Sequence, residues 1–266
     1  QLTGQTFYLK TSNYETELNL IDSLIDLDNE LDLIEAGKLT SVILSKQPNN
    51  KRALYDEFKI YSQQNNWSKA KKIINLLIET YPNEIDYQNE RGIMYIDQEK
   101  YDLAISEYTS LIEIDSEYIL AYSNRALCYY EKGEYEKALV DYTKCIELEP
   151  NEPKRYFRRA YYAHIPLEDY NSALVDYTKC IELEPNNSTY YNDRADFYSE
   201  YLEDYESALE DFNTAIDLSS SEYSVKRALN NRGLIYMDQE KYDLAISEYT
   251  SLIEIDSEYI LAYSNR

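Results

Sequence analysis

Apolar residues return every three to four positions along most of the chain, which is the spacing of an amphipathic helix. In the segment YDLAISEYTSLIEI, residues 101–114, Tyr101, Ala104 and Tyr108 follow one another at intervals of three and four. This spacing places all three side chains on one helical face. The same aromatic, alanine, aromatic spacing begins again at Tyr135, Tyr170, Tyr205 and Tyr242. The pattern predicts an all-α chain.

A second apolar-periodic segment precedes each of these helices and carries a small residue near its middle. The small residues are Gly92, Ala126, Ala160, Ala195 and Gly233, at separations of 34, 34, 35 and 38 residues. Two antiparallel helices can approach closely only where the facing side chains are small, and the aromatic rings then fill the space on either side. Each unit is therefore predicted to be a helix, a short turn and a second helix.

The chain repeats one of its own segments almost letter for letter. Residues 91–125 return at residues 232–266, 141 positions later, with three changes that each exchange one apolar residue for another. Weaker relatives of the same unit fill the interval. Self-similarity at a fixed short period is typical of repeat architectures, so we interpret the chain as an array of one small unit.

The most complete unit shows which family this array resembles. It carries a small residue, Tyr, Gly, Tyr, Ala, Tyr and Pro, at Ala126, Tyr129, Gly133, Tyr135, Ala138, Tyr142 and Pro150. Together with the period of 34, this pattern resembles the tetratricopeptide repeat. The resemblance covers about residues 17–266. It implies a right-handed superhelical solenoid of helical hairpins, whose first helices line a concave surface for a partner protein or peptide.

The boundaries follow from the period. We expect an extended lead-in over residues 1–16 and a single solenoid over 17–266, with no second domain. The expected units are 17–50, 51–84, 85–118, 119–152, 153–187, 188–225 and 226–259, with a partial unit at 260–266. The units that hold Ala160 and Ala195 carry one extra residue before their aromatic, which predicts longer turns that protrude on the same edge.

Composition narrows the classes of partner. The formal net charge is −24, whereas a nucleic-acid partner requires clustered Lys and Arg, and the same charge disfavours an anionic membrane surface. No run of 18 apolar residues predicts a membrane span. Tyrosine is abundant, at 31 residues, and about half of these occupy repeat positions. We expect the others to serve either contacts with a partner or packing between repeats.

The sequence offers no catalytic or cofactor-binding constellation. The one histidine, His164, is interpreted as a lone surface residue, because no nucleophile or metal ligand stands at a supporting spacing. The acidic run at residues 26–32 lacks the glycine of a calcium loop. We therefore expect no metal, no cofactor and no enzymatic activity.

The three cysteines and the start of the chain concern the compartment. Cys128, Cys145 and Cys180 are expected to be small buried residues. Cys145 and Cys180 occupy the same position in successive units, and such positions lie too far apart for a disulfide. The chain begins at Gln1 without methionine, which fits an exported protein or a trimmed one. We lean to an exported or extracellular location, where the sequons at Asn66, Asn186 and Asn187 would matter for glycosylation.

The family resemblance also suggests where a peptide would bind. Asn124, Lys154 and Arg158 resemble part of the carboxylate clamp by which some members hold a peptide's C-terminus. That clamp also takes a lysine and an asparagine from the preceding unit, where this chain has Asn89 and Ile93. The expected groove residues are Asn89, Asn124, Lys154, Phe157, Arg158, Tyr161, Asn192 and Asn230.

A charged pair recurs in register with the repeat. An arginine stands one residue before the small position, and an acid stands one residue before the second aromatic. The pairs are Arg91 and Glu107, Arg125 and Asp141, Arg159 and Asp176, Arg194 and Asp211, and Arg232 and Glu248. We call these residues the Arg–acid ladder. We expect each arginine to bond to an acid of its own or the adjoining unit.

Two functions fit these observations. The first is a non-enzymatic scaffold that binds a protein or peptide in the groove. The alternative is a structural protein whose solenoids join end to end into an extracellular filament. Residues 260–266 repeat residues 119–125, and the helix at 242–255 is as apolar as its interior twin. We expect its apolar edge to be covered by further copies of the repeat or by head-to-tail contact with another molecule.

Overall fold

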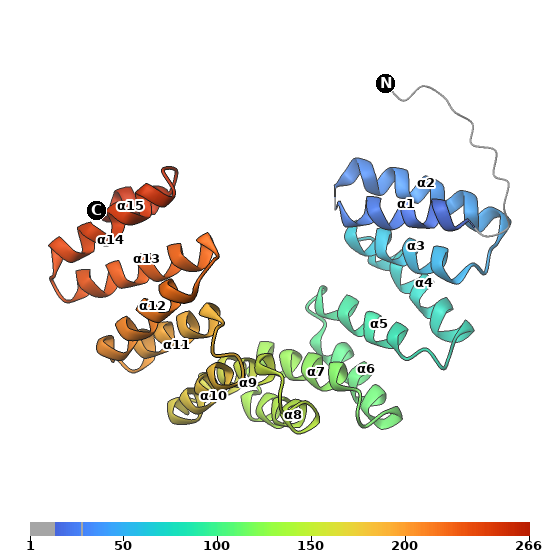
Figure 1. Ribbon diagram of the computed structural model, residues 1–266. Coiled ribbons are helices and arrows are strands. Elements are labelled where there is room, and N and C mark those ends of the chain that lie inside the picture. The colour runs from blue at the N-terminus through green and yellow to red at the C-terminus, as the bar shows by residue number, and fades with distance from the viewer. Residues whose placement is uncertain (1–13, 28) are drawn as a thin grey trace. The chain divides into compact units, whose positions relative to one another are not determined.

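The computed structural model describes residues 14–27 and 29–266, and the regular structure within those ranges is helical, with no strand (Figure 1). Most of the expected lead-in, residues 1–13, lies outside the described residues. The α-helices are α1 (Glu15–Asp26), α2 (Glu30–Lys46), α3 (Lys51–Gln63), α4 (Trp67–Thr80), α5 (Asp86–Ile96), α6 (Tyr101–Ile114), α7 (Ile119–Glu131), α8 (Tyr135–Leu148), α9 (Pro153–Arg159), α10 (Tyr170–Leu183), α11 (Ser188–Tyr201), α12 (Tyr205–Leu218), α13 (Glu222–Asp238), α14 (Tyr242–Ile255) and α15 (Ile260–Asn265). A π-helical turn, η1 (Ala160–His164), continues α9.

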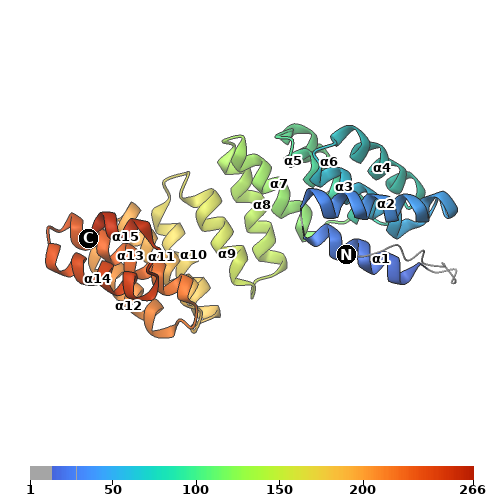
Figure 2. The ribbon, with the colours of Figure 1, turned by 90° about the horizontal axis from the view of Figure 1, so that it is seen from above.

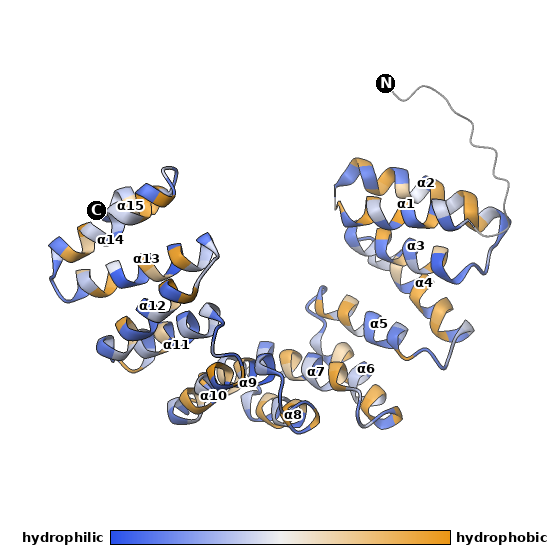
Figure 3. Cartoon of the chain, viewed as in Figure 1, coloured by the Kyte–Doolittle hydropathy of each residue, from blue (hydrophilic) through white to orange (hydrophobic). Residues whose placement is uncertain are grey.

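The helices form successive hairpins. The members of the pairs α1 and α2, α3 and α4, α5 and α6, α11 and α12, and α13 and α14 pack against each other, and they lie side by side in Figure 1 and in the perpendicular view of Figure 2. Apolar and polar residues alternate around individual helices instead of filling whole helices (Figure 3). The architecture is therefore an all-α solenoid of helix-turn-helix units, as the periodicity predicts.

The turn inside most hairpins contains one residue with left-handed backbone. These residues are Asn65, Glu99, Gly133, Glu168, Glu203 and Glu240, with φ between 52° and 72°. Only Gly133 adopts this conformation without steric cost from a Cβ. Several of the helices that follow are capped by a side chain, as where Asn66 accepts from the Lys69 N–H and Asp204 from the Ser207 N–H.

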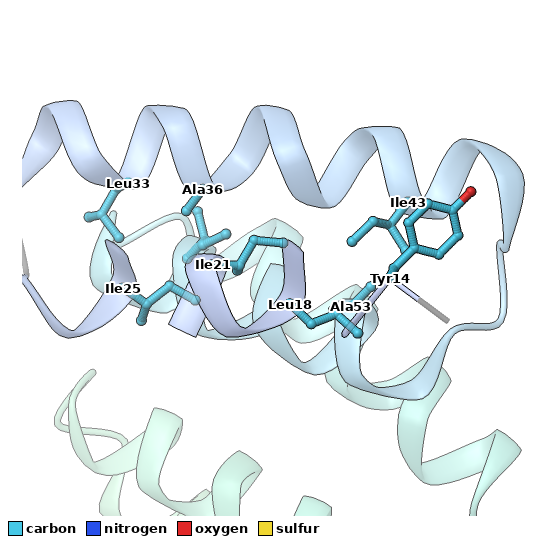
Figure 4. Close-up of a cluster of buried hydrophobic side chains, with 9 residues drawn as sticks. Tyr14, Leu18, Ile21, Ile25, Leu33, Ala36, Ile43 and Ala53 are labelled. Carbon is cyan, nitrogen blue, oxygen red and sulfur yellow. The ribbon is translucent and has the colours of Figure 1, made fainter. Parts of the chain in front are cut away.

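The chain divides into two compact units, residues 1–124 and 125–266, with the division inside α7. The first hairpins of the first unit bury aliphatic side chains. A cluster joins Leu18, Ile21 and Ile25 of α1 to Leu33 and Ile43 of α2 (Figure 4). Apart from Tyr14, which joins this cluster from the residue before α1, its members are aliphatic, so aliphatic side chains fill most of the space between these helices.

The second unit buries an aromatic ring in each hairpin. Tyr142, Tyr177, Phe212 and Tyr249 are at most 3% exposed. Each of the first three rings lies in a cluster with the small residue that the sequence assigns to its hairpin, Ala126, Ala160 or Ala195. The small position of one helix therefore accommodates the ring of the next.

The two one-residue insertions are absorbed differently. In regular hairpins the N–H of the residue just before the second helix donates to the carbonyl five residues earlier. The Glu134 N–H, for example, donates to the Tyr129 carbonyl. The bond from Asp204 to Tyr198 spans six residues, so there the turn is longer, as expected. In the other unit five residues, 165–169, separate η1 from α10, against three between α7 and α8, so the connecting segment is longer, as expected, although its closing bond is regular. The Asp169 N–H donates to the His164 carbonyl five residues earlier, as in a regular hairpin. The extra residue is accommodated in η1, where the Ile165 N–H donates to the Ala160 carbonyl, a span of five residues instead of the four of an α-helix.

Candidate functional site

The Arg–acid ladder forms an ion pair in each regular hairpin. The three aspartates each receive two hydrogen bonds, from the Nε and Nη2 atoms of Arg125, Arg159 and Arg194, at 2.6–2.9 Å. The two glutamates each receive one, from Nη2 of Arg91 at 2.8 Å and from Nη2 of Arg232. Bidentate pairing fixes the guanidinium in one plane and is the stronger arrangement.

Arginines of the ladder also reach the second helix of the preceding hairpin, as the bonds of Arg91, Arg159, Arg194 and Arg232 show. The donor is the arginine Nη1 atom in every case. Arg91 donates to Asn75 at 2.8 Å, Arg159 to Thr143 at 3.3 Å, Arg194 to Thr178 at 3.2 Å, and Arg232 to Asn213. A single side chain therefore joins three helices. The ladder is partly buried, and each of its acids is paired with an arginine, whereas the Nε atoms of Arg91 and Arg232 are buried without a hydrogen-bond partner among the described residues. These contacts tie neighbouring hairpins to one another.

Two of the expected groove residues lie in the first unit and bond to each other. The Asn124 amide donates to the Asn89 side-chain oxygen at 3.1 Å, and Asn89 is only 6% exposed. This contact joins α5 to α7. An Asn pair used in this way links successive first helices and leaves little of Asn89 for a partner.

The expected groove residues of the second unit are spread over three first helices. Lys154 is exposed on α9, and Asn192 is buried on α11, where its amide donates to the Ser224 hydroxyl at 2.8 Å. Asn230 donates to Asn231. Arg158 lies one turn after Lys154 on α9. The carboxylate clamp stays a prediction, since Asn124 belongs to the first unit and the two cations to the second.

Phe157 and Tyr161 line a cavity in the second unit. Its volume is about 260 Å³, and first helices supply most of its wall. The lining residues are Phe157, Tyr161, Ile165, Tyr177, Asp193, Asp196, Phe197, Glu200, Tyr201 and Arg227. We call this cavity the aromatic–acidic pocket.

Aromatic rings form one side of the aromatic–acidic pocket. Phe157 stacks on Tyr161 with ring centroids 5.9 Å apart, and Tyr201 stacks on Phe197 at 5.5 Å. Tyr177 lies between the two stacks, 6.0 Å from Phe157 and 5.3 Å from Phe197. Tyr161 and Tyr201 remain 45% and 36% exposed, so the aromatic wall is open to a partner at both ends.

Charged groups form the other side. Arg227 donates from Nε to Asp196 at 3.0 Å, and its Nη1 lies 2.8 Å from a carboxylate oxygen of Asp193. Asn231 also donates to Asp196, at 2.6 Å. Burial raises the pKa of the Asp193 carboxyl, and the positive charge of Arg227 opposes that effect. Asp193 and Asp196 are therefore held by groups of α13.

Glu200 differs from the other two acids of the pocket. Within the part of the chain that the structure describes, its carboxylate forms no hydrogen bond or ion pair. Burial raises its pKa above the ordinary value and the neighbouring Asp196 adds to that effect, whereas the positive charge of Arg227 opposes it. The pocket thus holds one acid without a partner.

Helix periodicity explains how α11 contributes so many lining residues. Asp193, Asp196, Phe197, Glu200 and Tyr201 follow at intervals of three, one, three and one, which is one face of an α-helix. Sequence reasoning missed this face, because in the unit 188–225 it assigned only Asn192 to the groove. The acidic and aromatic residues at helical spacing along residues 193–201 are the sequence signal that predicts this face.

A second cavity contains His164. Its volume is about 470 Å³, and Leu139, Thr143, Arg159, Asn171 and Asp176 are among its lining residues. The interpretation of His164 as a surface residue is wrong, since it is 7% exposed. Its Nε2 lies 3.6 Å from Asp176, and its Nδ1 lies 3.4 Å from Asp169. The π-helical turn ends at His164, so the inserted residue is what brings the ring inward.

Burial lowers the pKa of His164, although the carboxylate of Asp176 opposes the shift.

Over residues 14–27 and 29–266, no group of three His, Cys, Asp or Glu side chains is placed to hold a metal ion. In the same ranges, no helix is both long enough and apolar enough to cross a membrane.

Family comparisons match the repeats directly. Tetratricopeptide repeat profiles match residues 32–89, 119–152, 153–187 and 200–260, and a TPR repeat profile matches residues 92–133. The chain belongs to the tetratricopeptide repeat family. No match is found among curated protein sequences.

Solved tetratricopeptide repeat structures share the fold at low sequence identity. The C-terminal part of a TPR repeat-containing protein from Cytophaga hutchinsonii is 17% identical, with a TM-score of 0.67, over 93% of this chain and 98% of that one. A tetratricopeptide repeat protein from Parabacteroides merdae is 18% identical, with a TM-score of 0.62, over 94% and 97%. YrrB, described as a TPR protein with an unusual peptide-binding site, is 18% identical, with a TM-score of 0.51, over 72% and 96%.

Proposed function

We propose that this tetratricopeptide repeat protein is a non-enzymatic scaffold that binds a partner polypeptide at the aromatic–acidic pocket. The observation that carries the proposal is the open aromatic wall, in which Tyr161 and Tyr201 are 45% and 36% exposed above a cavity of about 260 Å³. Tyrosine offers a large contact area at low entropic cost together with a hydroxyl for hydrogen bonding. Such residues dominate protein–protein recognition sites.

The position of the pocket supports a role in binding. Its walls come mainly from first helices, which the family resemblance assigns to the binding surface, and both insertions of the repeat lie next to it. The turn η1 carries Tyr161, and Tyr201 ends α11 just before the longer turn. Single π-helical turns are frequent at functional sites, since they re-aim side chains at a cost to helix regularity.

The test uses a random peptide display library selected against the purified chain. Selected peptides are then measured by fluorescence anisotropy against wild type and the double variant Tyr161→Ala/Tyr201→Ala. We expect the variant to lose at least about tenfold in affinity, the effect of removing two aromatic contacts. Tyr223→Ala is the matched control, since Tyr223 is 74% exposed on α13 outside the pocket. Equal loss in both variants, or no selected peptide, would reject the proposal.

We also propose self-association as a second candidate, because exposed apolar side chains gather on α15. Tyr263 is 54% exposed. Ile260 and Leu261 are 80% and 58% exposed beside it. A contiguous apolar surface of this kind marks an interaction site. A hairpin of a second copy would cover it in a head-to-tail contact.

Sedimentation velocity over a range of concentrations tests this second candidate. Self-association predicts a sedimentation coefficient that rises with concentration, and a double variant Ile260→Glu/Tyr263→Glu that stays monomeric. A wild-type chain that sediments as a monomer throughout would remove the candidate and leave the peptide-binding proposal untouched.

A further inference from the structure

The aromatic–acidic pocket carries an excess of negative charge. Three carboxylates line it, those of Asp193, Asp196 and Glu200, against the one guanidinium of Arg227. Asp193 and Asp196 share that guanidinium, as its hydrogen bond and its ion pair show. The negative charge that no ion pair of the described residues neutralises is therefore that of Glu200, which is next to Tyr201 in the sequence.

Glu200 is exposed at the mouth of the pocket, where a partner can reach it, and the packing around it removes part of its hydration. Burial raises the pKa of Glu200, which means that the folded protein disfavours its charged form. An incoming cation would relieve this cost, because an opposite charge at close range stabilises the carboxylate. Electrostatic complementarity of this kind selects a partner by its charge.

The aromatic wall suits a cation as well. A guanidinium or ammonium group is attracted to the face of an aromatic ring, and arginine adds planar stacking. Tyr161 of η1 and Tyr201 of α11 both line the pocket, and both are partly exposed. A flat cation between them would contact both rings.

The size of the cavity limits what it can hold. Its volume of about 260 Å³ lies below the roughly 300–1,000 Å³ of sites for drug-sized ligands. It therefore fits one side chain rather than a whole small molecule. A bare metal ion is disfavoured, since Arg227 already occupies the carboxylates of Asp193 and Asp196.

We propose that the aromatic–acidic pocket receives one arginine side chain of the partner polypeptide, paired with the Glu200 carboxylate and lying between Tyr161 and Tyr201. This inference rests on the proposed function, because it names the residue of the partner that the pocket selects. A lysine would pair with Glu200 but would lack the planar stacking, so it ranks second.

The experiment compares three fluorescent peptide pools with a fixed central residue, arginine, lysine or citrulline, and random flanks. Citrulline keeps the size and planarity of arginine but removes its charge. In wild type we expect the arginine pool to bind about tenfold more tightly than the citrulline pool, the effect of one charge-assisted contact with cation–π support. Glu200→Gln should reduce that ratio to below about twofold. Glu206→Gln, an exposed acid of α12 outside the pocket, should leave it unchanged.

Each result decides between the two proposals. If the arginine and citrulline pools bind equally and both are lost in Tyr161→Ala/Tyr201→Ala, the pocket binds peptides and the arginine assignment is overturned. If the Arg-to-citrulline ratio persists in Glu200→Gln, the assignment is overturned as well. If no pool binds to wild type, the proposed function itself fails. Circular dichroism of each variant verifies that the helices are intact.

Discussion

The ring of Tyr108 occupies the space that a side chain on Gly92 would need. A Cβ placed on Gly92 would lie 2.6 Å from the Tyr108 Cζ atom and 2.8 Å from its hydroxyl oxygen. Gly233 and Tyr249 repeat this relationship, with 2.7 Å to Cζ. In the other regular hairpins the same position is alanine, as at Ala126 opposite Tyr142. The glycine hairpins therefore hold their helices closer to the ring.

Gly92→Ala should lower the free energy of unfolding by about 1–3 kcal/mol, because the added methyl group overlaps a buried ring. Gly37→Ala is the matched control, since nothing lies within 4 Å of its added Cβ on α2. That change should instead stabilise the chain by about 0.5–1 kcal/mol, the helix-propensity difference between the two residues. Urea unfolding measures both, and two changes of the same sign would contradict the contact.

Asp211→Asn should destabilise the second unit strongly. The Asp211 and Arg194 side chains are 7% and 18% exposed, and removal of the carboxylate leaves a partly buried guanidinium without its partner. We expect a loss of about 3 kcal/mol. Lys179→Ala, which breaks the exposed pair with Glu182, should cost under about 1 kcal/mol. Equal effects of the two changes in urea unfolding would show that burial does not matter to the pair.

Asp56 should make the stability of the first unit depend on pH. Its side chain is 1% exposed on α3, and burial raises its pKa from 3.8 to about 6. Lys59, 3.2 Å away, opposes this shift, whereas Asp22 on α1 adds to it. Because the folded pKa lies above the unfolded one, the stability contributed by protonation is complete below pH 3.8 and is lost as the pH rises through about 6.

The measurement compares wild type with Asp56→Asn by urea unfolding between pH 7 and pH 4. Wild type should gain on the order of 3 kcal/mol relative to the variant as the pH falls through this window. Asp22 behaves oppositely: burial raises its pKa, but hydrogen bonds from Lys59 and Arg52 outweigh burial and lower it overall, so its contribution is lost at low pH. A difference that does not change with pH would exclude Asp56 as the titrating group.

The cysteines should resist thiol reagents in the folded protein. Burial raises the pKa of Cys145 to about 11 and that of Cys128 and Cys180 to about 12, which keeps all three thiols protonated near pH 8. Ellman's reagent should therefore react slowly under native conditions and rapidly with all three cysteines in urea. Fast native reaction of any one would show that its hairpin opens locally.

The sequence predicts those features of the fold that depend only on residues within one repeat. The 3-then-4 spacing predicted the hairpins, because a helical face depends only on local periodicity. The burial of His164 could not be predicted, since it depends on whether one inserted residue lengthens a turn or widens a helix. The acidic side of the pocket was missed for another reason. In the sequence, Asp196 and Glu200 resemble ordinary solvent-exposed acids. Only the fold shows that Arg227, from the next hairpin, bonds to Asp196.

The arginines of the ladder determine how the array can come apart. Arg194 bonds to Asp211 within its hairpin and to Thr178 in the one before, so each hairpin is tied to its neighbour as well as closed on itself. In a one-dimensional array, the strength of such neighbour coupling decides how many repeats unfold together. Hairpins tied in this way should melt in blocks, with fraying confined to places where coupling is weak. The ladder is thus a source of cooperativity as much as of stability.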